Sequence, residues 1–190
     1  MISKNQALKI LEELKNSPNM VKHELAVGFT MAALFDFFEE KGKNPEMTKD
    51  DWEIVGIMHD ADYEFTNKSL ELHTEETTKK LKEIGADPMI IDAVRGHCDK
   101  APRTTLMAKG VYAVDELTGL IVACALVQPD KKLASVALES VMRKFKDSSF
   151  AKGANRDQIK TCEQELGIPL EKFISITLEA MQINHEKLGL

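Results

Sequence analysis

Hydrophobic positions along the chain recur with the period of an α-helix. Between residues 3 and 15, the side chains of Ile10, Leu11 and Leu14 fall on one helical face, and the turn Ser17-Pro18-Asn19 ends the segment. Strand-type alternation is almost absent, and glycine and proline recur only between helical segments. Nine helices are predicted, at about residues 3–15, 20–41, 48–60, 71–84, 87–97, 104–127, 131–145, 155–166 and 169–187. The pattern predicts one compact all-α domain of about eight or nine helices over residues 1–190.

Composition narrows the class of protein. The 190 residues carry a net charge of -6, which argues against general binding to nucleic acid or to an anionic membrane. The N-terminal segment is a charged amphipathic helix and does not resemble a signal peptide. Cys98, Cys124 and Cys162 form no CxxC pair, which is typical of reduced thiols in a cytoplasm. We therefore expect a soluble cytoplasmic protein.

The most apolar stretch, residues 111–127, is interrupted by Asp115 and Glu116. This interruption favours a buried helix over a membrane span. A carboxylate among aliphatic neighbours is costly to bury unless a cation or a hydrogen-bond donor accompanies it. Asp115 is therefore either a ligand or a half-exposed acid that points to solvent beside Glu116.

Four of the five histidines lie in the first hundred residues, each near a helix end or on a largely apolar helical face: His23, His59, His73 and His97. Asp60 follows His59 directly. Imidazole nitrogen and carboxylate oxygen form a ligand set suited to Mn, Fe, Co, Ni, Zn or Mg. Adjacent helical residues point about 100° apart, so His59 and Asp60 can share a metal only near a helix end. The break at Asp62-Tyr63 supplies that end.

The order H…HD…H…H…D resembles the HD-domain superfamily of metal-dependent phosphohydrolases. The matching pieces span about residues 20–127, and they are MVKHELAVG, VGIMHDADYE, SLELHTEETTKKL, IDAVRGHCDK and YAVDELTGLIVA. On this resemblance, the metal-site core covers about residues 20–127, and C-terminal helices follow at about 131–187. One departure follows the motif, because this chain continues HDADYE where many relatives continue HD-Ile-Gly-Lys.

The resemblance implies a ligand set. His23, His59, Asp60 and Asp115 match the four residues that bind a divalent metal in the superfamily, and His73 and His97 match the two extra histidines of members with a second metal. Six ligands suggest a binuclear site with Asp60 as the bridging carboxylate. His73 and His97 could instead be helix caps, or bind substrate phosphate beside a single metal. His59 and Asp60 are the predicted catalytic residues, with Asp60 as the proton acceptor and Asp62 as a weaker candidate.

Basic residues cluster in the segment VMRKFKDSSFAKGANR of this acidic chain. Lys144, Lys146 and Arg156, together with Arg95 near His97, are predicted to bind substrate phosphate. The alternative for the segment is a solvated helix end and loop, and for Arg95 a surface ion pair with Asp92 or Asp99. Cys98 is interpreted as a bystander beside His97, and His185 as a surface residue.

The sequence therefore predicts a metal-dependent phosphohydrolase. Metal-activated water would cleave a phosphomonoester or phosphodiester of a small nucleotide or related metabolite. A diiron oxygenase on the same fold and a non-catalytic, nucleotide-binding regulatory module are the alternatives. A homodimer is compatible with the sequence, which leaves the substrate and the native metal open.

Overall fold

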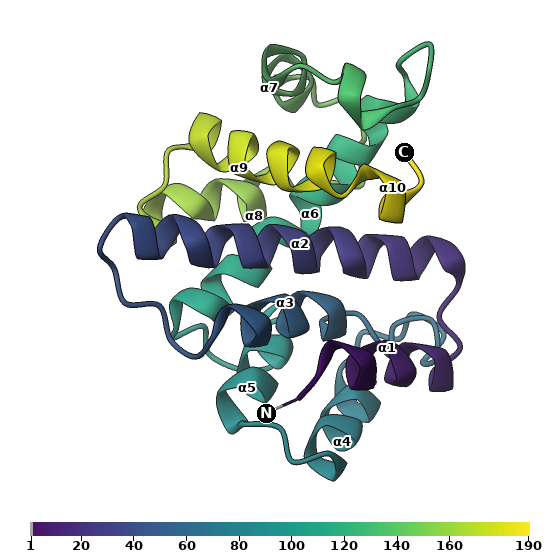
Figure 1. Ribbon diagram of the computed structural model, residues 1–190. Helices are drawn as coiled ribbons and strands as arrows, with labels where there is room; N and C mark the ends of the chain where they lie inside the picture. The colour runs from purple at the N-terminus through teal and green to yellow at the C-terminus, as the bar shows by residue number, and fades with distance from the viewer. Residues whose placement is uncertain (1) are drawn as a thin grey trace.

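The longest helix, α2 (Pro18–Glu40), runs through the middle of the molecule. The computed structural model describes residues 2–190. In Figure 1, α2 separates a lower group of helices, α1, α3, α4 and α5, from an upper group that contains α8, α9 and α10, while α6 crosses behind α2 and joins the two. Because α2 packs against α3, α6 and α9, its buried residues extend along most of its length, from Glu24 to Phe38. The central helix therefore organises both groups.

The described residues form ten α-helices, a 3₁₀ turn and a π-helical turn, and they contain no strand. The prediction of an all-α single domain is thus confirmed. The remaining elements are α1 (Lys4–Glu13), α3 (Lys49–Met58), α4 (Glu75–Glu83), α5 (Pro88–Gly96), α6 (Leu106–Leu126), η1 (Leu133–Ser135), α7 (Leu138–Lys146), α8 (Arg156–Thr161), η2 (Cys162–Leu166), α9 (Leu170–Ile183) and α10 (His185–Leu188).

Helix boundaries follow the capping signals in the sequence. Thr48 caps α3 in a capping box with Asp51, and Asp87 caps α5 ahead of Pro88. Several expected helices differ from the observed ones, among them α7 and the last predicted helix. Helix α7 begins at Leu138, because the chain before it forms η1 and an extended residue at Val136. The predicted helix 169–187 is interrupted at Asn184, so that α10 is a separate short helix.

Helix α6 contains the apolar stretch that the sequence predicts to be buried. Its aliphatic residues from Val111 to Ile121 lie in the core, which includes residues from Ile2 to Leu188. No helix within residues 2–190 combines the length and hydropathy that crossing a bilayer requires.

Two glycines let α2 and α3 touch at their backbones. A Cβ atom added to Gly56 would lie 2.6 Å from the Cα atom of Gly28, and one added to Gly28 would lie 2.9 Å from Ile57 Cγ1. Any larger residue would force the helices apart, because both are packed on their other sides. This contact lies about one helical turn away from the pair His23 and His59, so it helps to set how closely the two histidines approach.

We expect Gly56→Ala to lower the free energy of unfolding by about 1–3 kcal/mol, since the added methyl group overpacks the α2–α3 contact. Gly119→Ala is the matched control, because a Cβ atom there meets nothing within 4 Å. That control should gain up to about 1 kcal/mol from the higher helix propensity of alanine. Urea denaturation of both variants measures the difference, and equal midpoints would contradict the close approach.

Candidate metal centre

All six predicted ligands converge on one site where the lower helices meet α2 and α6. His23 lies within α2 and Asp115 within α6, whereas His59 and His97 cap the C-terminal ends of α3 and α5. Asp60 and His73 come from the segment between α3 and α4. The helix end required for His59 and Asp60 to share a site is therefore present, because α3 stops at Met58.

The first group of ligand atoms contains His23, His59 and Asp115. Asp115 Oδ1 lies 3.1 Å from His23 Nε2 and 3.4 Å from His59 Nε2. The two Nε2 atoms are 3.2 Å apart. Oδ2 of Asp60 lies 3.8 Å from both of them. Four side chains thus direct nitrogen or oxygen atoms at one point.

The second group contains His73 and His97, whose Nε2 atoms are 3.0 Å apart. Oδ1 of Asp60 lies 3.1 Å from His73 Nε2 and 3.2 Å from His97 Nε2. The two carboxylate oxygens of Asp60 therefore face different groups. This is the arrangement expected of a carboxylate that bridges two cations, in agreement with the role that the sequence resemblance implies for Asp60.

Each of the four imidazoles is held through its other ring nitrogen. Nδ1 of His59 lies 2.7 Å from the Gly56 carbonyl oxygen, and Nδ1 of His97 contacts the Val94 carbonyl oxygen. Nδ1 of His73 lies 3.0 Å from Asp62 Oδ1. Because carbonyl and carboxylate oxygens only accept, these three Nδ1 atoms donate a proton. Their Nε2 atoms are then free to bind a metal, which is the usual outer-sphere arrangement of metal-binding histidines.

His23 follows the same pattern through a hydroxyl. Thr118 Oγ1 donates to the Asp115 carbonyl oxygen at 2.9 Å and lies 3.3 Å from His23 Nδ1. Since the hydroxyl proton is used, Oγ1 accepts from Nδ1, and the lone pair of His23 Nε2 points into the site.

This tautomer pattern tests whether the residues fit a metal. Within each group, two Nε2 lone pairs face each other at 3.0 or 3.2 Å. Two facing acceptors repel unless a proton or a cation lies between them. The nitrogen and oxygen donors, the convergence of the Nε2 atoms and the shared Asp60 all fit two divalent cations.

Charge in the site favours cations as well. Burial opposes the imidazolium of His59, but the Asp60 and Asp115 carboxylates outweigh it and raise the pKa of His59 to about 10. Burial likewise opposes the charge on His73, and Asp60 and Asp62 raise its pKa to about 9. Protons therefore occupy the site in the absence of metal, and a cation that binds must displace them.

The two ligand carboxylates show the reciprocal effect. Burial raises the pKa of each, yet His59, His73 and His97 hold the pKa of Asp60 well below its usual range. His23 and His59 do the same for the pKa of Asp115. Both carboxylates are therefore ionised, and of the two alternatives for Asp115 the structure shows a carboxylate that contacts His23 and His59.

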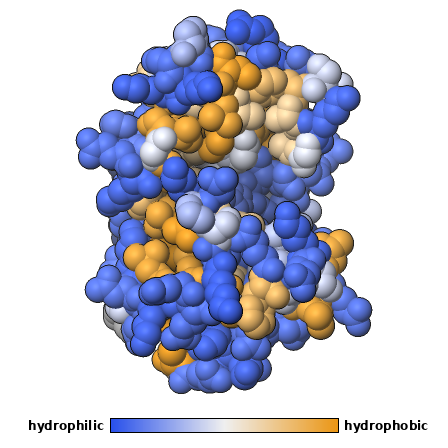
Figure 2. Space-filling model, turned by 90° about the vertical axis from the view of Figure 1, so that its right-hand side faces the viewer, coloured by the Kyte–Doolittle hydropathy of each residue, from blue (hydrophilic) through white to orange (hydrophobic). Residues whose placement is uncertain are grey.

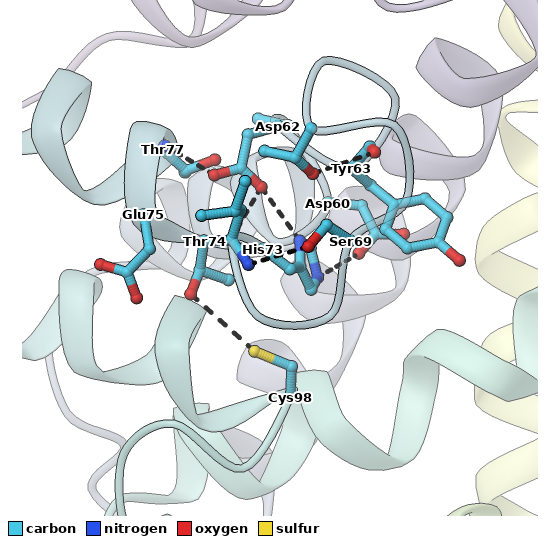
Figure 3. Close-up of polar contacts among 12 residues, drawn as sticks. Asp60, Asp62, Tyr63, Ser69, His73, Thr74, Glu75, Thr77 and Cys98 are labelled. Carbon is cyan, nitrogen blue, oxygen red and sulfur yellow. Dashed lines mark hydrogen bonds and ion pairs between the residues drawn. The ribbon is translucent and has the colours of Figure 1, made fainter.

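Asp62 lies behind His73 and contacts it together with Thr74 and Thr77 (Figure 3). Its side chain is fully buried, with Oδ1 accepting from His73 Nδ1 and from Thr74 N at 2.8 Å. Oδ2 accepts from Thr77 N at 3.0 Å. These bonds hold Thr74 in a left-handed conformation, φ 66°, so α4 begins at Glu75 and not at about residue 71. The weaker sequence hypothesis, Asp62 as a proton acceptor, is therefore corrected, because both oxygens are already used.

A cavity of about 650 Å³ opens onto the ligands. His23, Asp60, His73, His97 and Asp115 all line it. Sequence reasoning missed three further lining residues, Tyr63, Tyr112 and Glu116. Tyr112 and Glu116 could have been found from the sequence, because residues 112, 115, 116 and 119 of α6 have the i, i+3, i+4, i+7 spacing of one helical face. They therefore lie on the same face as the predicted ligand Asp115.

None of the four predicted phosphate-binding residues lines this cavity. The Arg156 guanidinium donates to the carbonyl oxygens of Ala151, at 2.6 Å, and Ala154, at 2.7 Å, and thereby shapes the loop 147–155. The Arg95 guanidinium pairs with Glu75 at 3.2 Å, and not with Asp92 or Asp99. Lys144 lies over the Phe150 ring, and Lys146 is exposed on α7. The loop itself reaches the cavity through Ala151, Gly153 and Ala154, but its charges do not.

Cys98 lies nearer the ligands than the sequence suggests. Its Sγ atom and one nitrogen each of His73 and His97 lie within 4.8 Å of one another. The thiol contacts the Arg95 carbonyl oxygen at 3.5 Å and Thr74 Oγ1 at 3.9 Å, and burial raises its pKa. The remaining histidine, His185, is exposed on α10, as predicted.

Behind the ligands, Glu24 is fully buried, and no hydrogen-bond partner is present for either of its carboxyl oxygens among the described residues. Burial raises its pKa to about 9; His59 opposes the increase, and Asp60 and Glu64 add to it. Between pH 4.5 and 9 the folded protein keeps this proton and the unfolded chain does not, so stability decreases as pH rises.

Glu24→Gln mimics the neutral carboxyl and removes this pH dependence. From pH 6 to pH 8, we expect the wild type to lose roughly 2–3 kcal/mol of unfolding free energy relative to the variant. Urea denaturation of both proteins in EDTA measures this difference. Parallel pH profiles would show that Glu24 is ionised in the fold.

Three comparisons with known proteins add nothing to the resemblance that the sequence carries. A scan of the chain against models of protein families gives no match, and searches of the curated proteins and of the solved structures give none either. What the site does must therefore be inferred from its own geometry: four histidines and two aspartates, arranged as two groups that share Asp60, at the base of a cavity.

Proposed function

We propose that the chain is a metal-dependent phosphohydrolase of the HD type, with two divalent cations held by the six ligands. The observation that carries the proposal is the position of Asp60, whose two oxygens face separate pairs of histidine Nε2 atoms. His23, His59 and Asp115 would complete the first metal position, and His73 and His97 the second. Two adjacent cations suit displacement at phosphorus, where charge is present on both the attacking and the departing oxygen.

The charge of the cavity supports the requirement for metal. No lysine or arginine lines it, whereas Asp60, Asp99, Asp115 and Glu116 do. Without cations, these acids would repel a phosphate group. Bound divalent cations supply the positive charge for phosphate and lower the pKa of a bound water towards neutrality.

Side chains of the protein would orient the metal ligands and the substrate. Hydrolysis joins a water oxygen to phosphorus and breaks the bond between phosphorus and the ester oxygen, which leaves as an alcohol after gaining a proton. The buried contacts at Nδ1 keep the histidine rings oriented while this occurs. Tyr63 and Tyr112 bring hydroxyl groups to the cavity, where they can donate hydrogen bonds to the phosphate or to the departing oxygen.

The proposal is tested by metal analysis of the purified protein, followed by a panel of phosphomonoesters, phosphodiesters and nucleotides. We expect about two ions per chain and phosphate release that EDTA abolishes and added Mn²⁺ or a similar cation restores. The variant His59→Ala should lose both the bound ions and the release of phosphate. Metal-independent release, or release unchanged in His59→Ala, would overturn the proposal, and so would dioxygen consumption by the iron-loaded protein without any phosphate release.

A further inference from the structure

A second cavity lies beside the first, next to the metal centre. It measures about 470 Å³ and lies between α2, α6 and α10. His23 and Gly119 line both cavities, so the two share part of their walls at the candidate ligands. A molecule with its phosphate at the metal centre can therefore extend into this second space, which we call the α2–α6 groove.

The walls of the α2–α6 groove are mainly apolar. Ala26 on α2, Val122 and Leu126 on α6, and Leu188 beyond them supply apolar side chains, and the polar side chains of Asn19, Lys22 and Thr118 also line it. The helical spacing explains this, because residues 19, 22, 23 and 26 share one face of α2, and residues 115, 119, 122 and 126 lie along one side of α6. Each helix thus presents a metal ligand at one point of the stripe and apolar residues further along it.

The rim of the α2–α6 groove is also apolar. Leu126 is 50% exposed, which is high for a large apolar residue. Figure 2 shows this side of the molecule, with hydrophobic residues gathered over the C-terminal helices above a hydrophilic waist. An apolar ligand group would cover surface of this kind.

Gly119 lies where the two cavities meet. It is inside α6, where glycine destabilises a helix relative to alanine, and its backbone does not have a positive φ. A Cβ atom at this position would meet no atom within 4 Å. Packing therefore does not require glycine here, whereas an open passage between the cavities does benefit from the missing side chain.

We propose that the phosphate ester taken by this site carries an apolar alkyl or acyl group, which lies in the α2–α6 groove and passes Gly119. This inference rests on the proposed function for the position of the phosphate. The apolar walls select the organic group by burying it, and the metal centre selects the phosphate. Each methylene group that enters the groove should raise the specificity constant by up to about fourfold.

The test compares methyl, butyl and octyl phosphate, whose leaving groups are similar in chemistry and differ in apolar length. With the metal-loaded protein, kcat/KM should rise at least about tenfold from methyl to octyl phosphate. Binding of the corresponding alkylphosphonic acids, which carry no ester bond to cleave, is measured in parallel by calorimetry and should follow the same order.

Variants separate the groove from the metal centre. Gly119→Leu fills the passage and Leu126→Glu places a charge at the far end, so both should bring the ratio of octyl to methyl close to one. Gly119→Ala should lower the ratio less and fold at least as well as the wild type. Val127→Glu is the matched control, since Val127 neighbours Leu126 but does not line the groove, and its ratio should remain that of the wild type.

The outcomes distinguish the two proposals. Equal turnover of methyl and octyl phosphate would overturn the groove and leave phosphohydrolysis standing. If no ester is cleaved but octylphosphonate binds more tightly than methylphosphonate, and Gly119→Leu and Leu126→Glu lose this difference, the groove is supported and hydrolysis is not. A ratio unchanged in Gly119→Leu and Leu126→Glu would overturn the groove, whatever the wild type prefers.

Discussion

Replacing Asp60 by asparagine is expected to remove at least one of the two cations that we propose and to lower kcat/KM for the proposed phosphate release by at least about a thousandfold. The carboxylate faces the Nε2 atoms of His73 and His97 with one oxygen and those of His23 and His59 with the other. An asparagine amide has a single oxygen and no charge, so it can serve one group at most. Loss of a single charge-stabilising donor already costs about a hundredfold to a thousandfold in other active sites, and Asp60 would act on both cations.

Metal content and steady-state kinetics measure this effect in the same preparation. Asp36→Asn is the control, because Asp36 is an exposed acid on α2 that pairs with Lys49 at the surface. It should keep both ions and full turnover. An Asp60→Asn protein that still binds two ions would contradict the bridging role, even if its turnover were low.

The second large effect is expected on the free energy of unfolding when Asp62 is replaced by alanine. Asp62→Ala leaves three buried donors without their acceptor, namely Thr74 N, Thr77 N and Nδ1 of His73. Removing a buried charged partner of this kind costs about 3–5 kcal/mol. Because His73 loses the group that orients it, metal affinity at its position should also fall about 10- to 100-fold.

Urea denaturation in EDTA separates the loss of folding free energy from the loss of metal. Asp62→Asn retains the shape and one acceptor, so it should be destabilised less than Asp62→Ala. Asp92→Ala, at an exposed position of α5, should change the unfolding free energy by less than about 0.5 kcal/mol. A denaturation midpoint of Asp62→Ala equal to that of the wild type would show that Asp62 does not hold the loop.

Much of the fold was predictable because helices depend on local signals. The apolar period, the caps at Thr48 and Asp87 and the glycine and proline positions act within a few residues of one another. A predicted helix boundary was wrong where a side chain outside the helix determines it. Helix α4 starts later than its pattern suggests, because Asp62 captures the backbone of Thr74 and Thr77.

The residues predicted to bind phosphate show what the sequence alone could not determine. A cluster of basic residues in an acidic chain favours a phosphate site, but charge alone does not say where a side chain points. Arg156 donates to carbonyl oxygens of its own loop, and Arg95 pairs with Glu75 away from the cavity. Both contacts depend on a three-dimensional path of the chain that no spacing rule encodes.

The sequence by itself determined the helical class of this protein and the six candidate ligands. The class follows from hydrophobic periodicity, and the ligands follow from ordered residues that resemble a known pattern. Only the tertiary structure decided that Asp60 faces both groups of histidines, that Asp62 is buried behind His73 and that Gly119 lies between two cavities. The physical reason is that these relations depend on how helices cross, and the crossing of α2 and α3 depends on the close approach of Gly28 and Gly56.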